Sequence, residues 1–263
     1  MMCRKSFLEI RQPFLCGIVI EDDPAKMIAG IRNSEYGGAS AVALHTRHLP
    51  AASKTVEGYR SILTHANVPT LVIHYREGDL FTDDECGNFL LNAAHAGASI
   101  VDVMGDLYCP SVHELTLDKD AVKRQKDLIN QLHEIGAAVI MSSHTKDFLS
   151  KEQVLSHMLE MQQRGVDMVK IVYSTDTQEQ LEDAICATSL LRKELDVPFL
   201  HLCNGKYGMT QRYIAPLLGS VLSFGSHEFI PNGHAYQIPL HCFKHLYDEM
   251  YSHASIKKLT ECK

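Results

Sequence analysis

The chain has 263 residues, 45% of them hydrophobic, and a formal charge of −7 at pH 7 from 25 Lys and Arg against 32 Asp and Glu. This length and composition exclude a disordered chain and a miniprotein scaffold, and they fit one large domain. The acidic balance offers no basic face for a phosphate backbone, so we expect no nucleic-acid partner.

No apolar run approaches the roughly 18 residues that a membrane span needs, and Glu9 interrupts the N-terminal stretch before a signal peptide could form. We therefore expect a cytoplasmic protein with no membrane partner. The eight cysteines form no C-x-x-C pair, which favours reduced thiols over a disulfide framework or a zinc site. The 15 histidines show no H-E-x-x-H spacing, so we expect neither a metal nor another cofactor.

Short apolar runs recur along the whole chain, each introduced by a glycine or a proline. In chain order they span 13–20, 38–44, 69–75, 97–103, 136–141, 165–172, 198–203 and 219–224. In four of them the glycine (Gly38, Gly97, Gly136 and Gly165) closes a helical segment, which predicts a left-handed helix cap followed by a buried strand. The pattern therefore predicts eight strands.

The segments between these runs have helical periodicity with one polar and one apolar face. They include 82–95, 119–134, 151–163 and 177–194. Unbroken alternation of strand and helix, with eight units of about 30 residues, predicts an α/β fold, a single-domain (β/α)₈ TIM barrel over residues 1–263. An open doubly wound sheet is less consistent, because Glu21-Asp-Asp-Pro follows the first strand where a glycine-rich phosphate loop would be expected.

The active site of such a barrel lies at the carboxyl ends of its strands, and Lys170 lies on one of these strands. Met168, Lys170 and Val172 share one face by the period-2 alternation of a strand. Burial of an ammonium among apolar neighbours disfavours its charge, and a neutral amine is a nucleophile for a carbonyl carbon. The alternative is a lysine whose stem is buried while its amine reaches water.

His144 ends the preceding strand, Val139-Ile-Met-Ser-Ser-His144. Neighbouring strands of a sheet lie about 5 Å apart, so His144 could reach a substrate that is held by Lys170. A histidine at a strand end is often only a structural hydrogen-bonding residue. Beside a Schiff-base lysine, it would supply the group that proton shuttling near neutral pH requires.

Four motifs together resemble the type I 3-dehydroquinate dehydratase family. They are Ser-Ser-His-Thr-Lys-Asp-Phe at 142–148, Asp167-Met-Val-Lys-Ile, Gly208-Met-Thr-Gln-Arg212 and Gly219-Ser-Val-Leu-Ser-Phe. The resemblance implies a (β/α)₈ barrel that converts 3-dehydroquinate into 3-dehydroshikimate and water in the shikimate pathway. It also implies that Lys170 forms an imine with the substrate ketone and that His144 is the general acid and base.

Other site residues follow only from this resemblance. Glu77, in Arg76-Glu-Gly-Asp79, is similar to the family's catalytic glutamate, and Asp102 is similar to an aspartate that supports the site. Arg212 resembles the arginine that binds the substrate carboxylate, and Gln237 the glutamine near the ring hydroxyls.

The chain departs from the family pattern in the shell that recognises the substrate. The second strand has Ala43 and His45 where the family has Glu and Arg, and Arg76 comes one position late after the third strand. We expect His45 and Arg76 to contact the substrate, and Arg47 and His74 could add donors if they face the barrel mouth. The imine chemistry is therefore better supported than the identity of the substrate.

Three functions remain open at this point. The first is a Schiff-base lyase that dehydrates 3-dehydroquinate. The second is a paralogue that uses Lys170 and His144 as a dehydratase or aldolase on another hydroxylated keto acid. The third is a barrel that binds a ligand without turnover, although a buried lysine that costs stability argues for retained chemistry. Each implies a small-molecule keto acid as partner, and a homodimer is expected for a barrel of this kind.

Overall fold

The computed structural model describes residues 6–10, 12–76, 78, 80–228 and 237–252. Strands and helices alternate along this part of the chain. The strands are β1 Phe14–Ile20, β2 Ala41–His45, β3 Thr70–Ile73, β4 Ile100–Met104, β5 Ala138–His144, β6 Met168–Ser174, β7 Phe199–Asn204, β8 Leu222–Ser226 and β9 Ile238–Pro239. The helices are α1 Pro24–Tyr36, a 3₁₀ turn η1 Ala51–Lys54, α2 Val56–Leu63, α3 Asp83–Ala96, α4 Lys119–Ile135, α5 Lys151–Gln162, α6 Gln178–Glu194, α7 Gly208–Leu218 and α8 Leu240–Ser252.

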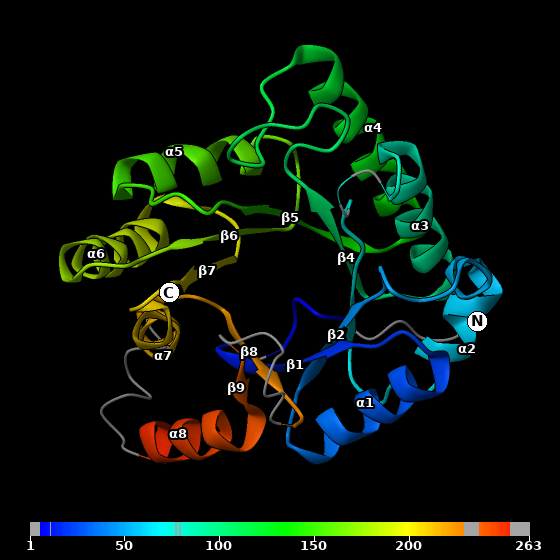
Figure 1. Cartoon of the computed structure of the whole chain (residues 1–263), viewed down its shortest axis with the longest axis horizontal. Helices are drawn as coiled ribbons and strands as arrows, with labels where there is room; N and C mark the ends of the chain where they lie inside the picture. Colours follow the sequence, from blue (N-terminus) through cyan, green and yellow to red (C-terminus); the bar gives the residue numbers. More distant parts are fainter. Residues whose placement is uncertain (1–5, 11, 77, 79, 229–236, 253–263) are drawn as a thin grey trace.

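The strands form one parallel sheet in the order β7-β6-β5-β4-β3-β2-β1-β8-β9. The sheet curls on itself, and the helices lie around its outside (Figure 1). The backbone N–H of Val221 donates to the carbonyl of Phe199 (3.0 Å), which brings the start of β8 against the start of β7. The predicted (β/α)₈ barrel is thus confirmed, with the short strand β9 as an unpredicted addition beside β8.

Two apolar layers fix the strands. The inner layer fills the barrel with alternate strand residues such as Ala43, Ile73 and Leu200, as period-2 side-chain alternation requires. The outer layer lies between the strands and the surrounding helices and includes Val42 and Leu128. Inward positions near the carboxyl ends of the strands are therefore left for polar side chains.

The glycines that were predicted to cap helices do adopt left-handed backbone angles. Gly38, Gly97, Gly136 and Gly165 have φ values of 90°, 108°, 87° and 86°. A residue with a Cβ is disfavoured in this region, so a glycine lets the chain leave a helix and enter the next strand within a few residues. In the described residues, no helix is both long and apolar enough to cross a membrane.

Candidate active site

Lys170 lies on β6 inside the barrel and forms an ion pair with Asp102. Its side chain is 4% exposed, and its Nζ lies 3.0 Å from Oδ2 of Asp102, which is fully buried on β4. Strand register places Ser142 of β5 directly beside Lys170, between β4 and β6. Met168 and Val172 belong to the apolar cluster inside the barrel, so the predicted shared face of Met168, Lys170 and Val172 is confirmed, and Asp102 supplies the carboxylate beside the Lys170 amine.

Tyr75, just after β3, is the second partner of Lys170. Nζ donates to the Tyr75 hydroxyl at 2.6 Å, and this hydroxyl donates to Asp102 Oδ2 at 2.5 Å. The same hydroxyl lies 3.1 Å from Ser142 Oγ. Burial, and then the nearby Asp102 carboxylate, raise the pKa of Tyr75 well above its usual value of 10, so Tyr75 is a neutral phenol.

His144 ends β5 at the mouth of the barrel, and Glu114 orients it. The backbone N–H of His144 donates to Glu114 Oε2 (2.7 Å), and ring Nδ1 lies 2.9 Å from the same oxygen. An ionised carboxylate only accepts hydrogen bonds, so this contact places a proton on Nδ1 and leaves Nε2 as the basic nitrogen. The His144 ring also meets the Tyr75 ring edge-on, with centroids 4.9 Å apart.

The ionised state of Glu114 depends on His144. Burial alone would raise the pKa of Glu114, but hydrogen bonds from the ring and backbone of His144 outweigh it, so the pKa is below the usual 4.5. Glu114 has a positive φ of 49°, which is uncommon for a residue other than glycine. The loop therefore holds a disfavoured conformation in which Glu114 meets His144.

Two predicted substrate contacts have different surroundings. His45, at the end of β2, is buried and meets the Tyr75 ring edge-on at a centroid distance of 5.2 Å, so it belongs to the same cluster. Arg76 instead forms ion pairs with Asp83 of α3 (2.7 Å) and Asp106 after β4 (3.1 Å). These pairs tie two neighbouring loops together and occupy much of the guanidinium of Arg76.

His74 lies outside the barrel rather than at its mouth. Its ring packs edge-on against Phe81 and Phe89, and Nδ1 contacts Thr46 at 3.0 Å. Burial lowers the pKa of His74 to about 3. Side chains alternate between the two faces of a strand, so His74 points to the opposite face from Tyr75. His74 therefore does not face the barrel mouth, as it would need to do to donate a hydrogen bond to the substrate.

Arg212 and Gln237 reach the carboxyl end of the barrel from later elements. Arg212, on α7, donates through Nε to the carbonyl of Cys203 and through Nη2 to Oδ1 of Asn204, both at 2.8 Å. These bonds fix the guanidinium at the end of β7. Gln237 precedes β9, and its Oε1 is buried without a hydrogen-bond partner among the described residues.

One predicted catalytic residue, Glu77, lies outside the described residues. Two residues that the sequence interpretation missed join the site instead, Tyr75 and Glu114. Tyr75 follows Leu71 and Ile73 in the inward-facing alternation of β3, and this signal could have identified it. Glu114 lies in an irregular loop, where no periodic signal exists.

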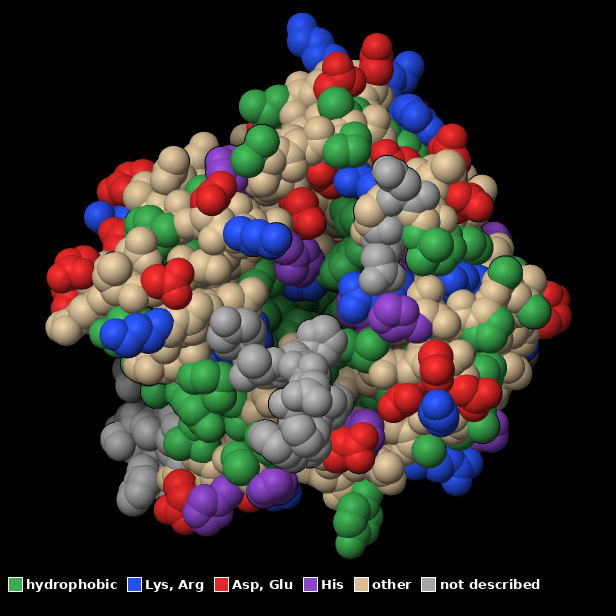
Figure 2. Space-filling view, viewed as in Figure 1, with side chains coloured by type: hydrophobic (Ala, Val, Ile, Leu, Met, Phe, Trp, Pro, Cys, Tyr) green, Lys and Arg blue, Asp and Glu red, His purple; other side chains and the backbone are tan. Residues whose placement is uncertain are grey.

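The molecular surface is hollowed over the middle of the curled sheet (Figure 2). Histidine and charged side chains of both signs lie around this hollow. No group of three or more His, Cys, Asp or Glu in the described part of the chain could hold a metal ion. The arrangement has the parts for imine chemistry: an amine, a carboxylate and phenol beside it, and an oriented imidazole.

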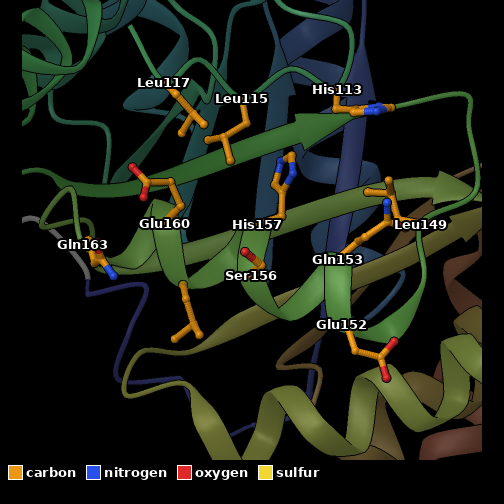
Figure 3. A pocket seen from close by; sticks show the side chains of 11 residues that line it. His113, Leu115, Leu117, Leu149, Glu152, Gln153, Ser156, His157, Glu160 and Gln163 are labelled. Carbon is orange, nitrogen blue, oxygen red and sulfur yellow. The ribbon is translucent and has the colours of Figure 1, made fainter. Parts of the chain in front are cut away.

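A separate pocket of about 640 Å³ lies between α5 and the loop before α4 (Figure 3). His113 and Leu115 line it on either side of Glu114, whereas Glu114 itself contacts His144. His157 of α5 lies 2.8 Å from Ser143 Oγ, and burial lowers the pKa of His157 to about 4. None of the predicted site residues lines this pocket, so it is distinct from the strand-end site.

The type I 3-dehydroquinase family model matches residues 15–254. The chain belongs to this family. It is 36% identical over 117 residues to a 3-dehydroquinate dehydratase of Alkaliphilus oremlandii, covering 43% of this chain and 44% of the relative. It is 31% identical over 140 residues to the enzyme of the same name from Clostridium kluyveri, covering 52% and 51%. The chain thus spans about half the length of these relatives.

Solved structures of the type I 3-dehydroquinase family share the fold. A type I 3-dehydroquinate dehydratase from Clostridium difficile superposes with a TM-score of 0.75 at 19% identity, covering 95% of this chain and 93% of that one. The 3-dehydroquinate dehydratase from Geobacillus kaustophilus gives 0.79 at 17% identity, covering 92% and 93%. At this identity the similarity shows the fold alone.

A Glu114→Gln variant should lower turnover by about tenfold or more, because a neutral amide no longer stabilises an imidazolium at His144. The pH–rate profile should also change on its acidic side, because the variant removes the ionisation of Glu114, whose pKa lies below the usual 4.5. Steady-state kinetics across pH would measure both effects. Glu134→Gln, on an exposed position of α4, is the matched control. An unchanged profile in Glu114→Gln would show that Glu114 only supports the loop.

Proposed function

We propose that this protein is a Schiff-base hydro-lyase that converts 3-dehydroquinate into 3-dehydroshikimate and water. The observation that carries the proposal is Lys170, whose side chain is 4% exposed inside the barrel and whose amine lies 3.0 Å from Asp102 and contacts Tyr75, which in turn packs against the oriented His144 ring. A solvated surface lysine would need none of these partners. Membership of the type I 3-dehydroquinase family and relatives named 3-dehydroquinate dehydratase support the same function.

The proposed reaction begins with attack of the neutral Lys170 amine on the substrate ketone. The resulting iminium withdraws electrons from the adjacent carbon and acidifies its proton. His144 Nε2 removes this proton and an enamine forms. The β-hydroxyl then leaves as water with the proton that His144 returns, and hydrolysis of the product imine frees Lys170. In this scheme Glu114 holds His144 in the tautomer that can act.

Two residues are proposed to hold the substrate carboxylate and hydroxyls. Arg212 is fixed at the end of β7 by its bonds to Cys203 and Asn204, and a guanidinium can bind a carboxylate through two hydrogen bonds. Oε1 of Gln237 is buried and has no hydrogen-bond partner within the described part of the chain, so it suits a hydroxyl donor. Glu77, outside the described residues, remains a predicted catalytic residue.

A second candidate substrate class is favoured by the changed recognition shell. Arg76 is committed to Asp83 and Asp106, and Ala43 provides no hydrogen-bonding group on β2. A polyhydroxylated substrate binds weakly where its hydroxyls find no hydrogen-bonding partner in the site. With Arg76 and Ala43 unable to supply such partners, we expect weak binding of a polyol. A less hydroxylated keto acid that is dehydrated or cleaved through the same lysine fits these residues.

Steady-state kinetics with 3-dehydroquinate decide between the two substrate classes. A micromolar KM with ordinary kcat would support 3-dehydroquinate and eliminate the second candidate. No detectable dehydration by a protein that still forms a Lys170 imine with other keto acids would contradict the first. Three further expectations stay predictions: a single-domain barrel over residues 1–263, a cytoplasmic location and a homodimer.

Replacing Lys170 with methionine should abolish covalent capture of a ketone. Wild-type protein treated with 3-dehydroquinate and borohydride should gain one reduced adduct by intact mass, because borohydride reduces an iminium to a stable amine. Lys170→Met alone leaves the buried Asp102 carboxylate unpaired, which costs about 3–5 kcal/mol. The double variant Lys170→Met/Asp102→Asn removes that charge as a folding control. Capture that persists in both variants would refute the Schiff base at Lys170.

The His144→Ala variant should separate imine formation from proton transfer. Lys170 should still be trapped by borohydride, while turnover falls by about 10²–10⁴, the usual contribution of a general acid and base. Intact mass after borohydride treatment would measure imine trapping, and a turnover assay on the same protein sample would measure the catalytic rate. Turnover close to that of wild type would make His144 a structural residue.

An Arg212→Lys variant should weaken binding of a carboxylate substrate by about 1–3 kcal/mol, or roughly fivefold to 150-fold in KM, through loss of a bidentate charge-assisted contact. The ratio of KM for a keto acid to KM for its methyl ester measures the contact with the carboxylate itself. If the ratio is the same in wild type and variant, Arg212 does not bind the carboxylate.

A further inference from the structure

The Tyr75 hydroxyl is the centre of a hydrogen-bonded chain that begins at the reacting nitrogen. Nζ of Lys170 donates to it, and it donates to Oδ2 of Asp102. Ser142 Oγ completes its surroundings at 3.1 Å. A hydroxyl that accepts from one group and donates to the next can pass a proton along the chain without ionising.

Among these groups, Tyr75 connects the buried ion pair to the barrel mouth. Asp102 is fully buried, whereas Tyr75 is half-buried and its ring contacts His45 and His144 at the strand ends. The other carboxylate oxygen, Asp102 Oδ1, is buried and has no hydrogen-bond partner among the described residues. Asp102 is therefore placed to take up a proton, and Tyr75 is placed to deliver one.

We propose that Tyr75 is a catalytic residue that relays protons between Lys170 and Asp102 while the imine forms and breaks. This proposal rests on the proposed Schiff-base function and assigns to Tyr75 the proton transfers at the Lys170 nitrogen and at the carbinolamine oxygen that leaves as the imine forms. His144 keeps the separate task at the substrate carbon and the leaving hydroxyl.

The relay balances in three steps. First, the Lys170 ammonium gives a proton to Tyr75 as Tyr75 gives its own to Asp102, which leaves a neutral amine and a neutral aspartic acid. Second, the amine attacks the ketone; the C–N bond forms, and a proton moves from nitrogen to oxygen to give a carbinolamine. Third, the C–O bond breaks as the nitrogen lone pair forms C=N. The departing hydroxyl takes a proton from Tyr75 and leaves as water, while Asp102 returns a proton to Tyr75.

The raised pKa of Tyr75 is consistent with a relay rather than with a free phenolate base. In each transfer Tyr75 accepts and donates together, so no phenolate persists in the buried site. A purely structural tyrosine would hold the Lys170 side chain in place but would not change how fast its nitrogen exchanges protons.

Formaldehyde tests the relay without any keto acid. Wild type and Tyr75→Phe are treated with formaldehyde and excess cyanoborohydride, so that imine formation limits methylation. Peptide mass spectrometry then follows the rate at Lys170 relative to the exposed Lys123. Tyr75→Phe should slow labelling of Lys170 at least tenfold and leave Lys123 unchanged. Equal rates at Lys170 in the two proteins would overturn the proposal.

Two further variants separate the relay from general damage to the fold. Tyr108→Phe removes the hydroxyl of a half-buried tyrosine whose ring packs under the Arg124 guanidinium, outside the site, so Lys170 should be labelled at the wild-type rate in this variant. Asp102→Asn keeps Tyr75 but removes the proton acceptor, so it should also slow labelling of Lys170. Labelling at the wild-type rate in Asp102→Asn would overturn the relay to Asp102.

Single-turnover assays with 3-dehydroquinate distinguish the two proposals. If Tyr75→Phe slows formaldehyde labelling but wild type never captures 3-dehydroquinate, the proposed substrate fails and the relay stands. If wild type and Tyr75→Phe form the 3-dehydroquinate imine at equal rates, the relay fails and the proposed function stands.

Discussion

The site depends on one buried ion pair, that of Lys170 with Asp102. Removing a lysine and an aspartate from water is costly, and a pair of this kind often contributes little net stability compared with apolar residues of the same size. Here the pair lies among the apolar side chains that fill the barrel, and the Tyr75 hydroxyl bridges it. Its retention is easier to explain by chemistry at the lysine nitrogen than by stability.

The position of this ion pair follows from strand geometry, so the direction of Lys170 and the nearness of its strand to that of Asp102 could largely be predicted from the sequence. Alternation along β6 turns Lys170 inward, and parallel register brings β4, β5 and β6 side by side, so Asp102 reaches Nζ across the barrel interior. The eight strands, the capping glycines and the ends of the longer helices follow from the same periodic rules. Where a residue lies on a regular element, its direction is largely fixed by its sequence neighbours.

The parts that could not be predicted lie beyond the regular elements. Arg76 lies after the end of β3, and its ion pairs are made with Asp83 and Asp106 from two other parts of the chain. Glu114 depends on a loop whose backbone has a positive φ at that residue. Neither periodicity nor spacing describes such a loop, because its shape is set by long-range contacts rather than by its own sequence.

Tyr75 in the barrel has an electrostatic consequence for the whole site. A guanidinium beside Lys170 would repel its ammonium form and would attract the substrate carboxylate toward the lysine. A neutral phenol does neither, and Asp102 can instead form a close ion pair with Lys170. Arg212, fixed at the end of β7, is then the cation proposed to attract the substrate carboxylate. The proposed site thereby separates two tasks, because β7 and α7 hold the cation proposed to bind substrate, while β4, β6 and the segment after β3 hold the groups proposed to move protons at the Lys170 nitrogen.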